Sequence, residues 1–164
     1  MNEQIQTLYF SGYCYWSMEA VFTHLKGVRE TIAGWISQRE SADIEAVRID
    51  FSPKEIDAST LIEIHLAMHS SAAKTGIKKR YPTRVFSHKA SNTKLLQSLI
   101  EDISRNSERN CYCKSERLST FHPAKSQYQN YYLKGPEKPY CQQYIRPKLE
   151  QLNKRWPKLF TAKI

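Results

Sequence analysis

Cys14 stands where an apolar run gives way to a helical pattern. Residues 8–10 read as a buried strand, and beyond Cys14 apolar residues recur at close to helical spacing up to Gly27. A cysteine at such a junction lies at a helix N-terminus, where free N–H groups and the helix dipole stabilise a thiolate. Tyr15 and Trp16 follow directly, so an apolar substrate group can dock beside the sulfur. The pattern predicts an activated cysteine nucleophile, with a buried, space-filling cysteine as the alternative.

Two further residues have side chains that can donate or accept a proton. Glu45 begins an alternating strand, where a carboxylate can face a cleft, although a surface carboxylate is the plainer interpretation. Tyr81 is either a hydroxyl at a site or a core aromatic with its hydroxyl at the rim. The residue types alone leave both alternatives open.

Strands and helices that would position these residues interleave irregularly along the chain. We expect strands over residues 5–10, 28–36, 45–51, 81–86 and 111–118. We expect helices over residues 15–26, from a cap at Ser59 to residue 69, over 91–106, and from near Pro147 onward. Residues 121–139 are rich in Tyr, Gln, Lys and Pro, which predicts an ordered loop with a helical turn. The irregular order favours an α+β fold.

Length and composition are typical of a globular protein. The chain has 164 residues, which suits a single domain spanning 1–164. Lys and Arg outnumber Asp and Glu by 25 to 16, a formal charge of +9. That charge suggests a nucleic-acid-associated protein, but no such motif accompanies it, so we interpret it as a solvated basic surface. No apolar stretch reaches the roughly 20 residues of a membrane span, and the N-terminus lacks a signal-peptide layout, so we expect a cytoplasmic protein.

The cysteines do not predict a structural framework. The four are Cys14, Cys111, Cys113 and Cys141, and in a cytoplasmic chain they argue against disulfides. Cys111 and Cys113 are closer together than the usual zinc pair, and no second pair stands at ligand spacing. We therefore expect no metal site.

The ordered set of motifs resembles one family. Residues 13–19, Tyr-Cys-Tyr-Trp-Ser-Met-Glu, resemble the Gly-Cys-Phe-Trp-Gly-x-Glu signature of the A-class peptide-methionine sulfoxide reductases. Further segments resemble that family's motifs, in the same order and over nearly the whole chain: 27–35, 45–53, 61–69, 81–86, 127–131 and 139–149. The resemblance implies a two-layer sandwich with a mixed, mostly antiparallel sheet and a ferredoxin-like core.

The resemblance also implies a reaction. In such enzymes a thiolate attacks the sulfur of an S-epimer methionine sulfoxide, which leaves a cysteine sulfenic acid and releases methionine. The sulfoxide oxygen is a poor leaving group until an acid protonates it. By this likeness Cys14 is the nucleophile, Glu45 the acid and Tyr81 its hydrogen-bonding helper. Tyr15 and Trp16 would hold the substrate's methyl group.

Recycling follows from the same resemblance. Family members usually form a disulfide from the sulfenic acid to a C-terminal cysteine, which thioredoxin then reduces. Cys141 is the closest match to that cysteine, with Cys111, Cys113 or an external thiol as alternatives. We expect no bound organic cofactor, thioredoxin or a small thiol as reductant, methionine sulfoxide (free or in proteins) as substrate, and a monomer.

Several positions depart from the family pattern. The chain is shorter between Trp35 and Glu45, which removes the segment that normally supplies a second active-site tyrosine. Gly76 falls where the family has an aspartate that helps to bind the substrate backbone. Glu19 matches the signature and is expected to serve the first turn of its helix. Because polar contacts are lost, a catalytically weakened or inactive member that acts as a binding protein is the alternative function.

Overall fold

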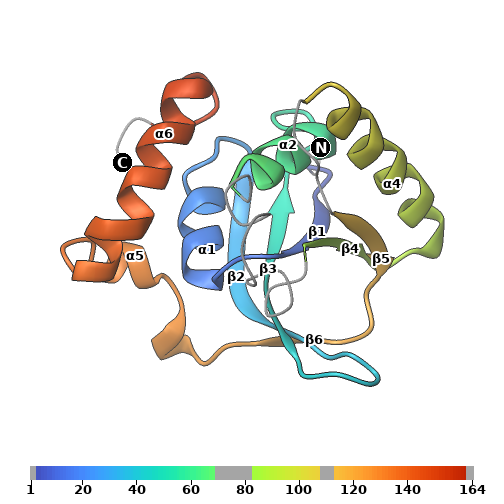
Figure 1. Ribbon diagram of the computed structural model, residues 1–164, viewed down its shortest axis with the longest axis horizontal. Coiled ribbons are helices and arrows are strands. Elements are labelled where there is room, and N and C mark those ends of the chain that lie inside the picture. The colour runs from blue at the N-terminus through green and yellow to red at the C-terminus, as the bar shows by residue number, and fades with distance from the viewer. Residues whose placement is uncertain (1–2, 69–82, 108–112, 162–164) are drawn as a thin grey trace.

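The computed structural model describes residues 3–68, 83–107 and 113–161, and a six-stranded sheet lies at its centre (Figure 1). The strands are β1 (Gln6–Ser11), β2 (Val28–Ile36), β3 (Ile44–Phe51), β4 (Arg84–Ser87), β5 (Lys114–Arg117) and β6 (Phe121–Pro123). They lie in the order β5-β4-β1-β3-β2-β6. Neighbouring strands are antiparallel except β4 and β5, which are parallel.

Helices fill the connections between the strands. They are α1 (Tyr15–Thr23), α2 (Ala58–Met68), α4 (Ala90–Arg105), α5 (Tyr131–Lys134) and α6 (Arg146–Arg155). A short 3₁₀ turn, η2 (Ser126–Tyr128), precedes α5, and a π-helical turn, η3 (Cys141–Ile145), runs directly into α6. The chain order β1-α1-β2-β3-α2-β4 with the sheet order β4-β1-β3-β2 is the ferredoxin-like arrangement. The predicted α+β class and core are confirmed. Across the described ranges, no helix has the length and apolar character needed to cross a membrane.

One face of the sheet carries the main core. Side chains alternate between faces along a strand, so every second residue of β1 and β3 points to the same side. On this side the largest strand residues pack against α1 and α2: Leu8, Phe10, Val47, Ile49 and Phe51. Figure 1 shows α4 and α6 at opposite sides of this assembly. The junction of β1 and α1, which carries Cys14, is thus held by core packing from both elements.

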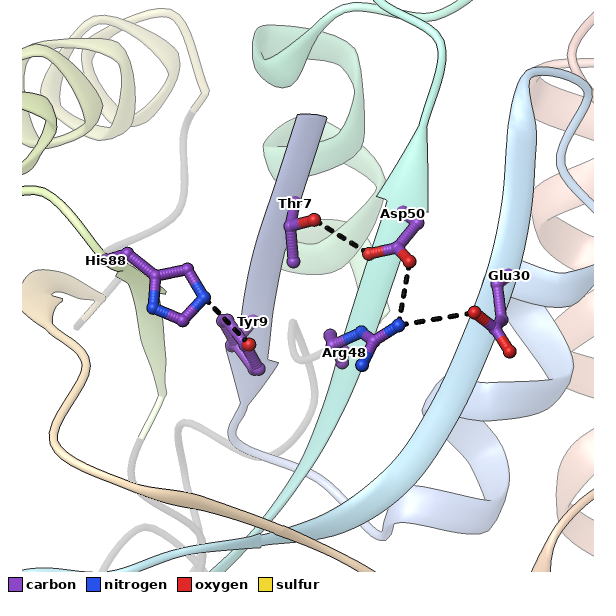
Figure 2. A network of polar contacts seen from close by, with 6 residues as sticks. All are labelled: Thr7, Tyr9, Glu30, Arg48, Asp50 and His88. Carbon is purple, nitrogen blue, oxygen red and sulfur yellow. Dashed lines mark hydrogen bonds and ion pairs between the residues drawn. The ribbon is translucent and has the colours of Figure 1, made fainter. Parts of the chain in front are cut away.

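The opposite face of the sheet carries a polar network (Figure 2). Asp50 on β3 accepts hydrogen bonds from Thr7 on β1 and from Arg48, each at 2.8 Å. Arg48 also pairs with Glu30 on β2, at 3.2 Å. These bonds join the three central strands on the side turned away from α1 and α2.

Two local predictions were wrong. Asp57, and not Ser59, caps α2, because its carboxylate accepts a hydrogen bond from the Thr60 amide at 2.8 Å while Ser59 lies inside the helix. The segment expected as a loop from residue 121 begins with β6, which pairs with residues 34–36 of β2. A strand of three residues is too short to show alternation in a sequence.

A tight turn at Gly12 connects β1 to the segment that carries Cys14. Gly12 has a φ of +126°, and a Cβ at that position would stand 2.8 Å from the Cα of Thr83. Only glycine tolerates both this backbone conformation and this close approach. Position 13, which is glycine in the signature that this segment resembles, carries the Tyr13 side chain here.

His65 of α2 fixes the end of β1 from inside the core. Its Nε2 donates a hydrogen bond to the Ser11 carbonyl at 2.8 Å, and its ring centroid lies 4.8 Å from that of Phe10. The side chain is fully buried. Burial lowers the pKa of His65 to about 4. The hydrogen bond to Ser11 raises the pKa, but it offsets only part of the effect of burial. His65 is therefore neutral in the folded protein at pH 7.

We expect acid to destabilise the protein through His65. The unfolded chain binds a proton at this residue near pH 6.5 but the folded chain only near pH 4, so the full contribution to stability is present above pH 6.5. It is lost as the pH falls from 6.5 to 4, and amounts to about 3 kcal/mol over that window. Urea denaturation of wild type and His65→Gln at pH 7 and pH 5 measures it. An equal pH dependence in the two proteins would contradict the assignment.

Candidate active site

Cys14 lies immediately before the first turn of α1. Its backbone is extended, with φ −56° and ψ 129°, and its carbonyl accepts hydrogen bonds from the amides of Ser17 and Met18, each at 3.1 Å. The side chain is partly exposed and the thiol is free. The structure therefore confirms that Cys14 lies at a helix N-terminus.

The ionisation of Cys14 differs from the sequence expectation. Burial raises the pKa of the Cys14 thiol, and the nearby Glu45 carboxylate raises it further. Hydrogen bonding with the Tyr140 hydroxyl and with the backbone of Trp16 and Ser17 acts to lower the pKa, but it does not offset burial. The sequence pattern predicted the helix terminus, which favours the thiolate. It contained no information on how deeply the turn that carries Cys14 is buried.

Glu45 of β3 lies beside the nucleophile. Its Oε1 accepts a hydrogen bond from the Tyr15 amide at 3.4 Å, at the start of α1. The side chain is half-buried, and the backbone of Glu45 is paired with Trp35 on β2. The carboxylate is therefore not a fully exposed surface group: it is half-buried and bonds to the first residue of α1, next to Cys14 in the sequence.

Aromatic side chains line one side of Cys14. Trp16 stacks on Tyr131 of α5 with ring centroids 4.0 Å apart and planes 9° apart, and meets Tyr140 edge-on at 6.0 Å. Tyr15 is 7% exposed and packs between Trp16 and Trp35, at 5.9 and 5.5 Å. Trp16 is thus covered on one face by Tyr131, and Tyr15 presents little surface to a ligand.

Glu19 connects α1 to the start of α5, which carries Tyr131. It lies one turn into α1 and is 1% exposed, and its Oε1 accepts a hydrogen bond from the Tyr131 amide at 3.2 Å. Burial raises the pKa of Glu19, although hydrogen bonds from the amides of Asn130 and Tyr131 favour its ionised form. The expectation that Glu19 serves the first turn of its own helix is corrected: it binds the start of α5 and so fixes Tyr131 against Trp16.

Lys148 is a partly buried charged residue near Tyr13, the residue before Cys14. Lys148 of α6 donates a hydrogen bond to the Met68 carbonyl at the end of α2, at 2.8 Å. Its Nζ lies 5.3 Å from the centroid of the Tyr13 ring. Burial lowers the pKa of Lys148. Sequence analysis assigned no role to Lys148, Tyr131 or Tyr140, although all three lie in segments that match the family motifs.

The remaining cysteines differ in their placement. Cys141 is fully buried at the start of η3, with a free thiol, and directly follows Tyr140. Cys113 is 5% exposed and precedes β5, where the Lys114 amide bonds to the Thr83 carbonyl at 3.3 Å. Tyr81, Gly76 and Cys111 lie outside the described residues. Among the residues whose placement is described, no group of three or more His, Cys, Asp or Glu side chains forms a metal site.

Comparison with known proteins identifies the family. The family model described as peptide methionine sulfoxide reductase matches residues 6–159. The peptide methionine sulfoxide reductase MsrA of Vesicomyosocius okutanii is 31% identical over 90% of this chain and 98% of its own length. The MsrA of Chromobacterium violaceum is 26% identical over 90% and 94%.

Solved structures share the fold. Reduced Mxr1 from Saccharomyces cerevisiae superposes with a TM-score of 0.65 at 16% identity, over 84% of this chain and 90% of that one. Mxr1 in complex with Trx2 gives a TM-score of 0.60 at 15% identity, over 76% and 84%. With the family model matching nearly the whole chain, this protein belongs to the peptide methionine sulfoxide reductase family.

Proposed function

We propose that this enzyme reduces methionine-S-sulfoxide with Cys14 as nucleophile and Glu45 as proton donor. The observation that carries the assignment is the placement of both groups at one helix terminus: the Glu45 carboxylate bonds to the amide that directly follows Cys14. In net terms, the cysteine thiol and the sulfoxide become a sulfenic acid and methionine. The substrate sulfur gains two electrons, the cysteine sulfur loses two, and the oxygen moves to the cysteine.

The Glu45 carboxylate acts electrostatically on the nucleophile. Its negative charge raises the pKa of Cys14. The reactive arrangement is a thiolate beside a protonated Glu45, because the sulfur then attacks while the acid protonates the departing oxygen. A polar sulfoxide oxygen in front of Glu45 gives that proton a new acceptor.

Trp16 is the stronger of the two candidates for recognition of the substrate's methyl group. It is partly exposed and its orientation is fixed by the stack on Tyr131, whereas Tyr15 is nearly buried. We therefore assign Trp16 to direct contact and Tyr15 to support of the Trp16 ring. The helper role proposed for Tyr81 rests on the sequence resemblance alone.

Thiol chemistry completes the cycle. We propose thioredoxin or a small thiol as the reductant, supported by the Trx2 complex of the structurally similar Mxr1.

Cys141 is our candidate for the internal resolving thiol, and its burial means that η3 must open before it pairs with Cys14. The thiols of Cys14 and Cys141 are free, which suits a reducing compartment such as the cytoplasm.

A single-turnover experiment tests the function. The reduced enzyme is mixed with an excess of methionine-S-sulfoxide in the absence of any reductant, and released methionine is quantified. We expect one equivalent of methionine per protein molecule from the S epimer and none from the R epimer. Thiol titration then distinguishes a persistent sulfenic acid, which consumes one thiol, from an internal disulfide, which consumes two. Release of no methionine from either epimer would overturn the proposed function.

A further inference from the structure

Lys138 is an exposed lysine that is held in a defined position beside the aromatic residues of the site. It lies between α5 and η3, where its amide donates a hydrogen bond to the Gly135 carbonyl at 3.1 Å and its carbonyl accepts one from the Gln142 amide at 3.0 Å. Its aliphatic stem crosses Gly135, where an added Cβ would stand 2.6 Å from the Lys138 Cε. The glycine makes room for the stem, so both the backbone and the side chain of Lys138 are fixed.

The ammonium group of Lys138 lies against the Trp16–Tyr131 stack. Its Nζ is over the Tyr131 ring at 4.4 Å from the centroid, while Trp16 stacks on that ring with a centroid distance of 4.0 Å. Taken end to end, the two distances place the ammonium at most about 8.4 Å from the Trp16 ring centroid. This is about one Debye length at physiological ionic strength, so the charge of Lys138 acts on a ligand that contacts Trp16.

The charge of Lys138 is not neutralised within the described part of the chain. No acidic side chain there forms an ion pair with it, and its exposed neighbour Glu137 pairs with none of the described cations. Of the two other carboxyl groups at the site, Glu19 is buried and Glu45 is the proton donor that we propose. The aromatic side of the site therefore presents a positive charge that can take an anionic partner.

We propose that Lys138 is a specificity-determining residue, which favours substrates that carry a carboxylate next to the methionine sulfoxide. The inference rests on the proposed function, in which Trp16 contacts the substrate's methyl group. The carboxylate belongs either to an Asp or Glu beside the oxidised methionine in a protein, or to the α-carboxyl group of free methionine sulfoxide. Neighbouring Cα atoms in a peptide are about 3.8 Å apart, so both carboxylates can reach an ammonium this close to the methyl contact.

Peptide binding measures this preference without turnover. Cys14→Ser protein is titrated by calorimetry with blocked pentapeptides that have methionine-S-sulfoxide at the centre, flanked on both sides by glutamate, glutamine or lysine. We expect the glutamate peptide to bind about two- to fivefold more tightly than the glutamine peptide at low ionic strength, the size of an exposed ion pair. The preference should disappear in about 0.5 M salt. Adding Lys138→Gln should remove the preference, Lys138→Arg should keep it, and Lys138→Glu should transfer it to the lysine peptide.

A second comparison distinguishes the two sources of the carboxylate. Free methionine-S-sulfoxide and its carboxamide differ only at the α-carboxyl group, so a preference for the free acid that Lys138→Gln removes assigns the contact to that group. A preference seen only with the peptides assigns it to the flanking side chain. Either result supports the proposal.

Lys94→Gln is the matched control. It removes the same charge from an exposed position on α4, which lies at the opposite side of the molecule from α5 (Figure 1), and should keep the preference. The proposal is overturned if neither comparison shows a preference, if Lys138→Gln leaves it unchanged, or if Lys94→Gln removes it equally. With Cys14 intact, release of methionine without any charge preference contradicts the role of Lys138 alone. A preference that depends on Lys138, with no release of methionine, contradicts the proposed function alone.

Discussion

Cys14→Ser is expected to abolish the release of methionine from methionine-S-sulfoxide, with a loss of roughly four orders of magnitude or more in kcat/KM. Serine replaces the sulfur with a smaller oxygen at the same position, so the turn at Gly12 and the start of α1 are expected to remain in place. Its hydroxyl cannot form a sulfenic acid and is a far weaker nucleophile. The measurement is the single-turnover release of methionine, followed by turnover with dithiothreitol.

Cys113→Ser is the control for the Cys14 variant. Cys113 is a buried cysteine before β5, and the first turnover requires no resolving thiol. Its variant is therefore expected to release the same single equivalent of methionine as wild type. Full activity in Cys14→Ser would show that another residue attacks the sulfoxide, and loss of activity in both variants would point to a general requirement for folding.

The position of the nucleophile was predictable because it depends on local sequence. The change from an apolar strand to a helical repeat at Cys14 is visible over a few residues, and the structure confirms β1 and α1 on either side. The ferredoxin-like core was predictable from the resemblance, whose motifs cover nearly all its elements. Strand β6 was missed because its pairing with β2 is set by tertiary contact and not by its three residues.

The electrostatics of the site were not predictable in the same way. The pKa of Cys14 depends on burial and on Glu45 and Tyr140, which come from β3 and from the C-terminal region. Likewise, the Glu19 carboxylate reaches α5, more than a hundred residues along the chain. A sequence pattern shows which residues belong to a family motif, but such long-range contacts decide whether a matched residue serves chemistry, support or packing.

Glu45→Gln is expected to lower kcat/KM for methionine-S-sulfoxide by about 10²- to 10⁴-fold, the range typical of a lost general acid. Glutamine keeps the oxygen that accepts the Tyr15 amide hydrogen bond, so the geometry at the start of α1 is preserved. It has no acidic proton to give to the sulfoxide oxygen. The control is Glu30→Gln, which removes a carboxylate from the opposite face of the sheet, where it pairs with Arg48.

The same substitution should have the opposite effect on the reactivity of Cys14 itself. The Glu45 carboxylate raises the pKa of the Cys14 thiol, so its removal lowers that pKa and increases the thiolate fraction at neutral pH. Iodoacetamide, which needs no proton donor, should therefore alkylate Glu45→Gln faster than wild type at pH 7. Slower reduction together with faster alkylation separates loss of the acid from damage to the nucleophile. If both rates fell together, Glu45 would be a structural support of the α1 terminus and the proton would have to come from another group.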